Sequence, residues 1–191
     1  PTTTVLQTTG VDDTFLNSTS PTTNYATGVD FYVGDAGGAS NAIHTLIEFD
    51  MSSIPSGDTV TSSTLSLFEK GAGDNAGVGS WAVNVHLLLV DWVEGYATWR
   101  DYTHITAWPG SGGASTNGTD RRAAVSATVT LDGTASVAFV DWAGATFTQD
   151  TQDYVDGTLP NYGWIVEAPA AEYQGGNNSY NEFSSSNHAT A

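Results

Sequence analysis

Apolar and polar side chains alternate with a period of two along several short stretches of this chain, which is the pattern of a β-strand with one buried face. The clearest stretch is Trp81 to Val90, in which every second residue as far as Leu89 is apolar and Asn84 and His86 lie on the opposite face. Its far end is apolar on both faces, so it predicts a strand at the centre of a sheet. A chain built from such segments is expected to fold as packed β-sheets.

Residues 43–70 predict two strands and the turn that connects them. Ile43, Ile47 and Phe49 lie on one face of the first strand, and Leu65 and Leu67 lie on one face of the second. The connection contains a proline and a glycine, which are typical of a chain reversal. We therefore predict a connected strand pair with one buried face and one face in water.

Further strands are predicted where β-prone or alternating runs are bounded by turn residues. They are Thr2–Thr9, a short strand after Asp12-Asp13, and residues 29–33, 125–131, 136–142, 162–168 and 180–185. Residues 148–157, TQDTQDYVDG, form the single predicted helix, which Gly157 would terminate. Roughly ten short strands without alternating helices predict an all-β fold, a two-sheet antiparallel β-sandwich that is jelly-roll-like and carries one short helix.

A chain of 191 residues is long enough for one hydrophobic core and short for two. We predict one domain over residues 1–191. The absence of cysteine excludes disulfides and thiolate metal sites, and no run of about 18 apolar residues is present that would span a membrane. The chain begins at Pro1 rather than at an initiator Met, so we expect that a leader was removed or that the sequence is an excerpt.

Acidic residues outnumber basic residues by 21 to 4, which gives a net charge of −17. A surface of this sign repels phosphates and anionic lipids, because binding to either depends on Lys and Arg. We therefore expect neither nucleic acid nor a membrane as partner. The acidity has three interpretations, which are solubility, adaptation to high salt, and Ca²⁺ ligation by carboxylate-rich loops.

A structural Ca²⁺ is predicted from carboxylates early in the chain, because the oxygen-only shell of this ion suits clustered Asp and Asn side chains. Asp12 and Asp13 open a strand there, and Asp30 and Asp35 follow nearby in the sequence. No EF-hand loop is present, so this prediction depends on composition.

Five aromatic side chains crowd a segment rich in turns, and they are Trp92, Tyr96, Trp99, Tyr102 and Trp108. Exposed rings in such a segment would stack on the pyranose faces of a polysaccharide. The alternative is that these rings cap one end of the sandwich.

No catalytic motif is found in the sequence. The four histidines stand far apart without the spacing of a zinc site, and we expect them to be ordinary surface or turn residues. They are His44, His86, His104 and His188. No GxSxG elbow occurs, and carboxylate pairs arise by chance among 21 acidic residues, so we expect a protein that is not an enzyme. Glycosylation sequons begin at Asn17, Asn117 and Asn177, all in predicted loops.

Several motifs occur in an order that resembles a known family. They are TNYATGVDFYVG, LIEFDMSSIPSGDTVTSSTLSL, DWVEGYATW, DYVDGTLPNYGWIVEA and NEFSSS. Together they resemble the DNRLRE-type domain over residues 9–187. The resemblance implies similarity to polysaccharide-binding modules attached to extracellular enzymes and adhesins, and to segments of phage structural proteins.

The chain departs from this resemblance at two places. Glu48 stands where such domains commonly have a basic residue, and the chain stops at SSNHATA where they continue into a final strand. An empty strand slot would expose about three apolar side chains at about 2 kcal/mol each, which rivals the stability of a whole domain. Three alternatives stay open: a truncated chain, a slot filled by the chain's own Thr2–Thr9, or a terminal strand exchanged with a neighbouring subunit.

Two functional hypotheses of different class follow. The first is a non-enzymatic structural or adhesive surface module, a building block of a virion or extracellular assembly, whose partners are copies of itself or a shell protein joined by strand addition. The second is a carbohydrate-binding module of a longer exported protein. Both predict a location outside the cell or on a virion surface, and we favour the first.

Overall fold

A computed structural model describes residues 4, 6, 10–35, 37, 41–72, 80–131, 137–169 and 180–188. Within these ranges the elements are β1 (Val11–Asn17), β2 (Asp30–Asp35), β3 (Ala42–Phe49), β4 (Thr64–Ala72), β5 (Trp81–Leu87), the 3₁₀ turn η1 (Gly112–Ala114), β6 (Ala127–Leu131), β7 (Phe139–Ala143), α1 (Ala145–Val155), β8 (Trp164–Glu167) and β9 (Tyr180–Ser184). The predicted strand Thr2–Thr9 lies almost entirely outside the described residues. No helix in the described ranges is long and apolar enough to cross a membrane.

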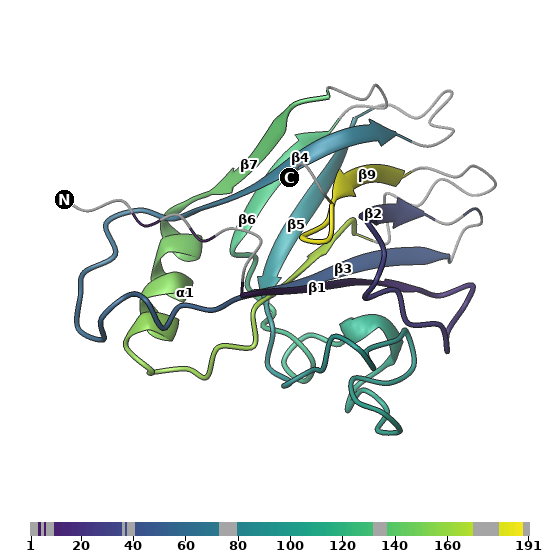
Figure 1. The fold of residues 1–191 in the computed structure, drawn as a ribbon, viewed down its shortest axis with the longest axis horizontal. Helices are drawn as coiled ribbons and strands as arrows, with labels where there is room; N and C mark the ends of the chain where they lie inside the picture. Colours follow the sequence, from purple (N-terminus) through teal and green to yellow (C-terminus); the bar gives the residue numbers. More distant parts are fainter. Residues whose placement is uncertain are drawn as a thin grey trace.

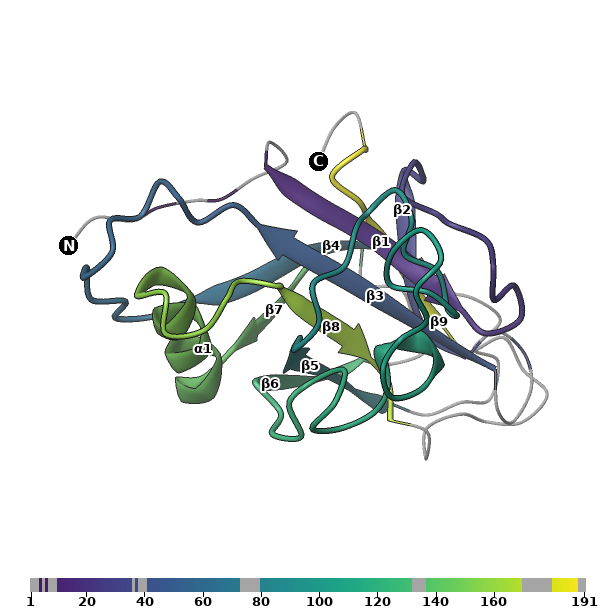
Figure 2. The same cartoon turned by 90° about the horizontal axis from the view of Figure 1, so that it is seen from below.

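The strands form an antiparallel β-sandwich, as the sequence predicts. Hydrogen-bonded neighbours follow the order β6-β5-β8-β3-β2-β9-β4-β7, and β1 pairs with β3 outside this path. Figures 1 and 2 show the path folded over into two layers, with β1, β3, β8, β5 and β6 in one layer and β2, β9, β4 and β7 in the other. Strand β3 joins the layers, because Thr45–Ile47 pair with β8 while Ala42 and Ile43 pair with β2.

The alternating faces of the strands meet in the predicted core. Trp81, Val83, Val85 and Leu87 of β5 are all buried in the main hydrophobic cluster. Leu89 does not join them: it is 39 % exposed, because β5 ends at Leu87 and the chain then leaves the sheet. The last part of the predicted strand Trp81–Val90 is therefore wrong.

Helix α1 closes one end of the sandwich (Figure 1). Phe147 and Tyr154 are buried against Trp164, with ring centroids 5.0 and 5.1 Å from it. Gly157 has a φ of +68° and its N–H bonds the carbonyl of Tyr154, so the predicted glycine does end the helix. The helix begins three residues earlier than the predicted Thr148, at Ala145.

The predicted pairing of residues 43–49 with 64–70 is wrong. Strand β3 pairs with β1, β2 and β8, whereas β4 pairs with β7 and β9 in the opposite layer. The connection between them runs past α1, where Gln152 accepts the N–H of Val60 at 2.7 Å and donates to the carbonyl of Asp58 at 3.0 Å. The second expectation, that one face of β3 lies in water, is also wrong, because His44 and Leu46 on that face are buried.

Candidate functional site

The face of β3 that was expected to be exposed is covered by residues 88–126, named here the covering segment. Figures 1 and 2 show its teal loops beneath the layer that contains β1, β3 and β8. A second hydrophobic cluster seals the contact: the strands contribute Leu16, Leu46 and Ile165, and the covering segment contributes Leu88, Trp92, Ala97, Trp108 and Ala114. Strands β1, β3 and β8 are therefore buried on both faces where the segment lies.

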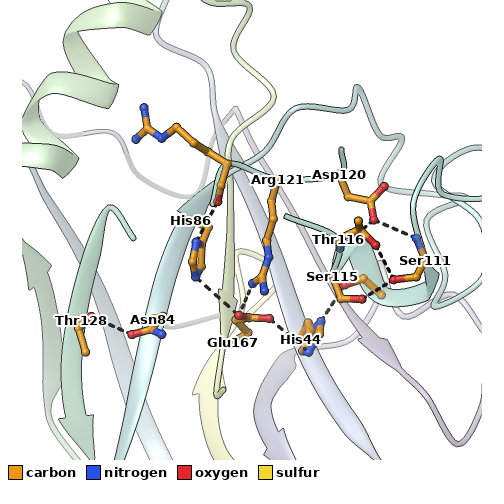
Figure 3. A network of polar contacts seen from close by, with 12 residues as sticks. His44, Asn84, His86, Ser111, Ser115, Thr116, Asp120, Arg121, Thr128 and Glu167 are labelled. Carbon is orange, nitrogen blue, oxygen red and sulfur yellow. Dashed lines mark hydrogen bonds and ion pairs between the residues drawn. The ribbon is translucent and has the colours of Figure 1, made fainter. Parts of the chain in front are cut away.

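The covering segment is held in shape by a buried carboxylate. Asp120, which is fully buried, accepts the backbone N–H groups of Gly110 at 2.8 Å, Ser111 at 3.2 Å and Thr116 at 3.0 Å. The carbonyl of Asp120 accepts the N–H of Leu89 at 2.9 Å. These bonds attach the segment to the end of β5 and direct the next side chain, Arg121, toward the sheet (Figure 3).

Four ionisable side chains meet between the sheet and the covering segment. His44 of β3, His86 of β5 and Glu167 of β8 lie on the outer face of the sheet. Strand β8 lies between β3 and β5, and its Val166 pairs with Thr45 on one side and with Val85 on the other. The residues next to these three in the sequence therefore point to the opposite face, which is the outer one. The Nε2 atoms of His44 and His86 each lie 3.6 Å from a carboxylate oxygen of Glu167. Arg121 forms an ion pair with the same carboxylate (Figure 3). All four residues are at most 8 % exposed.

Each histidine also fastens the covering segment through its second ring nitrogen. The Nδ1 atom of His44 lies 2.7 Å from the carbonyl of Gly113, and that of His86 lies 3.1 Å from the carbonyl of Arg122. A carbonyl only accepts, so both Nδ1 atoms carry the proton. The ring of Trp99 packs 5.0 Å from that of His44 and closes the site beside Gly113.

Burial lowers the pKa of both histidines below the ordinary 6.5, and the neighbouring Arg121 cation lowers it further. The Glu167 carboxylate opposes this shift without reversing it. The site at neutral pH is therefore one ion pair, Glu167 with Arg121, between two neutral imidazoles. The site is closed to solvent, and its positive and negative charges neutralise each other. It therefore serves to attach the covering segment to the sheet.

Sequence reasoning missed this site. His44 and His86 were expected at the surface, but they are 3 % and 4 % exposed. One signal was present: each histidine stands within a run of apolar residues, with Leu46 two positions after His44 and Leu88 two positions after His86. Two apolar neighbours on the polar face indicate that this face is covered.

A group of carboxylates lies at the other end of the same outer face. Burial and the nearby charges of Asp12, Asp91 and Asp50 raise the pKa of Glu48 from 4.5 to about 7. On the inner face of β1, burial also raises the pKa of Asp13, although it accepts the N–H of Ser186 at 2.6 Å. In the described part of the chain, no three His, Cys, Asp or Glu side chains are placed to hold a metal ion.

The structure does not bring the four predicted Ca²⁺ ligands together. Asp12 and Asp13 pair with Glu48 and Ile47 near one end of β3, whereas Asp35 pairs with Ala42 at the other end, about 20 Å away. Asp30 lies 2.5 Å from the ammonium group of Lys70. A single ion cannot bridge these positions.

The five predicted glycan-binding aromatics are spread over different environments. Trp92 and Trp108 are buried, and their indole N–H groups donate to the carbonyls of Tyr162 and Thr98, each at 3.0 Å. Trp99 and Tyr102 are partly buried. Tyr96 is the accessible member: it is 49 % exposed and contacts the ring of His104 edge-on. Among the sequons, Asn17 ends β1 rather than lying in a loop, Asn117 is exposed in a turn, and Asn177 lies outside the described residues.

Because two histidines are buried, we predict that the free energy of unfolding of the domain falls at acid pH. An unfolded chain binds protons near pH 6.5, whereas the folded chain resists them because both pKa values are lowered. The stability that this difference supplies is complete above about pH 6.5 and is lost as the pH falls toward the folded values. We expect a loss of up to about 1.4 kcal/mol per histidine for each pH unit in that window, measured as urea midpoints across the pH range.

Glu48 acts in the opposite direction and must be separated from the histidines. Its raised pKa of about 7 stabilises the fold most below pH 4.5, and that contribution is lost as the pH rises to 7. The variant Glu48→Gln should therefore show a steeper acid loss than the wild type. In that background His86→Asn should roughly halve the slope, whereas His104→Gln, at an exposed position, should leave it unchanged. If stability fell equally steeply with acid in Glu48→Gln and in both of its double variants, the buried histidines would not be the source of the acid sensitivity.

Comparison with known proteins adds one finding to this geometry. A family model described as the disaggregatase related repeat domain matches residues 13–191, which includes every described strand but the first two residues of β1. No curated protein matches the chain.

Proposed function

Because the chain belongs to the family of disaggregatase related repeat domains, we propose that it is a non-enzymatic structural and adhesive module, a building block of an extracellular or virion-surface assembly. The proposal has one main support. One convergent group of ionisable side chains, His44, His86, Arg121 and Glu167, is sealed: Arg121 pairs with Glu167, and each imidazole bonds a backbone carbonyl. A catalytic group must reach its substrate, and these groups are occupied in holding the domain together.

The distribution of charge points to the same role. Each of the four basic side chains already contacts a carboxylate: Lys70 with Asp30, Arg100 with Asp101, Arg121 with Glu167, and Arg122 with Asp150. No basic side chain is left over to neutralise the other carboxylates, so the chain keeps its net charge of −17. Copies of such a module repel one another at long range, and salt screens that repulsion.

The proposal is tested by light scattering on the purified chain at low and high ionic strength, together with an assay for polysaccharide cleavage. We expect the average mass to rise with salt as copies associate, and no release of reducing sugar. Cleavage that survives repurification and is lost on a single substitution would overturn the proposal. A mass that stays monomeric at every salt and protein concentration would also count against it.

A carbohydrate-binding module is the second candidate, and the exposure of Tyr96 beside His104 supports it. A single exposed ring supplies one stacking platform for a sugar. On a glycan array, Tyr96→Ala should then abolish binding, whereas Phe139→Ala, which removes a 68 % exposed ring on β7, should not. Trp108 is unsuitable as a test position, because its truncation would open the second hydrophobic cluster.

A further inference from the structure

An apolar cleft of about 470 Å³ opens between the two layers of the sandwich. Val11 and Phe49 line it from one layer, and Phe31 and Leu67 line it from the other. Apolar surface of this kind is normally covered in a monomeric protein, because its exposure to water is unfavourable.

The cleft lies beside an edge of β4 that pairs with another strand along only part of its length. Strand β4 pairs with β7 along Thr64–Phe68, but it pairs with β9 only from Glu69 onward. Among the described residues, no strand pairs with the second edge of Thr64–Phe68. The segment that would continue β9 turns away, because Ser185 donates its N–H to Val29 and Ser186 donates to Asp13.

A residue that precedes the first strand also reaches this cleft. Leu6 lines it and packs, partly buried, against the main hydrophobic cluster. Leu6 precedes both β1, which begins at Val11, and the family match, which begins at residue 13. It therefore belongs to a stretch that precedes both, residues 1–9, named here the arm.

The arm is chemically suited to the cleft. Its sequence PTTTVLQTT contains no charged side chain, while the domain carries a net charge of −17. An uncharged segment avoids the repulsion that an acidic segment would meet at such a surface, and β-branched residues favour an extended backbone.

We infer that the cleft is a docking site for the chain's own amino-terminal arm, with Leu6 as the anchor. Three alternatives were open for the slot of the final strand. This inference selects the one in which the chain's own Thr2–Thr9 fills the slot. In an assembly of repeated copies, a setting that rests on the proposed function, an arm docked on its own domain would keep this cleft from binding a neighbouring copy.

The first test compares Leu6→Asp with Thr4→Asp in the full chain. Thr4 is an exposed described residue of the same arm, so the pair changes charge equally and differs in the contact with the cleft. We expect Leu6→Asp to lower the thermal midpoint by about 3 °C or more and Thr4→Asp to leave it unchanged. Leu6→Ala provides a milder variant if the aspartate prevents folding. Equal midpoints for all variants would overturn the inference.

The second test asks whether the vacated cleft accepts the arm from solution. A fluorescent peptide of residues 1–9 should bind the Leu6→Asp chain and should bind the wild type weakly, because the wild-type cleft is occupied. The same peptide carrying the Leu6→Asp change should bind neither. A wild type that is dimeric and becomes monomeric on Leu6→Asp would overturn docking within one chain and assign the cleft to a second copy. These readouts on the monomer do not depend on salt-driven association or on polysaccharide cleavage.

Discussion

Replacing Glu167 by glutamine is expected to destabilise the domain by about 3–5 kcal/mol, because it removes the negative charge from a buried cluster and keeps the cation. Arg121 would then lie 8 % exposed with no carboxylate to neutralise it, between the imidazoles of His44 and His86. A loss of this size is a large share of the 5–15 kcal/mol that stabilises an ordinary domain. Urea unfolding at pH 7.5 measures the change.

The control for this prediction is Glu182→Gln. Glu182 also faces a cation, with Lys70 at 3.6 Å, but both side chains of that pair are more than a quarter exposed. Its loss should cost no more than about 1 kcal/mol. The double variant Glu167→Gln with Arg121→Met should recover part of the stability, because the unpaired cation is gone. If the double variant lost as much free energy of unfolding as Glu167→Gln and Arg121→Met lose together, the ion pair would not be the source of the effect.

Replacing Gly163 by alanine is expected to cost more than about 3 kcal/mol, because it combines backbone strain with overlap against a neighbouring strand. Gly163 has a φ of +71°, and an added Cβ would overlap the carbonyl oxygen of Ile47 and lie 2.8 Å from the Cα of Glu48. Strand β8 would have to move away from β3 to accept it. The carbonyl of Gly163 also accepts bonds from Leu88 and Tyr154, so the shift would reach β5 and α1.

Gly157 offers a matched control for the strain alone. Its φ is +68°, nearly that of Gly163, but an added Cβ there meets no atom within 4 Å. Gly157→Ala should therefore cost about 1–2 kcal/mol, the penalty for a left-handed alanine. Chemical denaturation of the two variants separates strain from overlap. Similar losses for both would show that the approach of β3 to Gly163 is unimportant.

The alternation of side chains predicted the layers well, because it depends only on the chain's own period. Trp81, Val83, Val85 and Leu87 all lie in the core, and the helix ends at the expected glycine. Strand pairing was predicted less well. Neighbouring strands in the sequence, β3 and β4, lie in opposite layers, and β3 pairs instead with the preceding strands β1 and β2 and with the distant β8. Those partners depend on the whole topology, which local patterns do not contain.

The candidate site was invisible in the sequence for the same reason. Its four residues stand at positions 44, 86, 121 and 167, and each looks ordinary among its neighbours. The environment of His44 is set by a loop nearly seventy residues later, since Gly113 is its hydrogen-bond partner. Similarly, Trp92 and Trp108 are placed in a turn-rich segment, and only the packing of that segment onto Leu46 and Ile165 explains why they are buried.

The pairing of every basic side chain has a consequence for digestion. Trypsin-like enzymes cut after Lys or Arg and require an accessible, deformable stretch of backbone. Lys70 lies within β4, Arg121 is buried, and the N–H of Arg122 bonds the carbonyl of Leu87. Arg100 alone has a largely exposed side chain, yet its N–H and carbonyl are both bonded, to Pro21 and Trp108. Such a protease would meet no ready cleavage site until the domain opened.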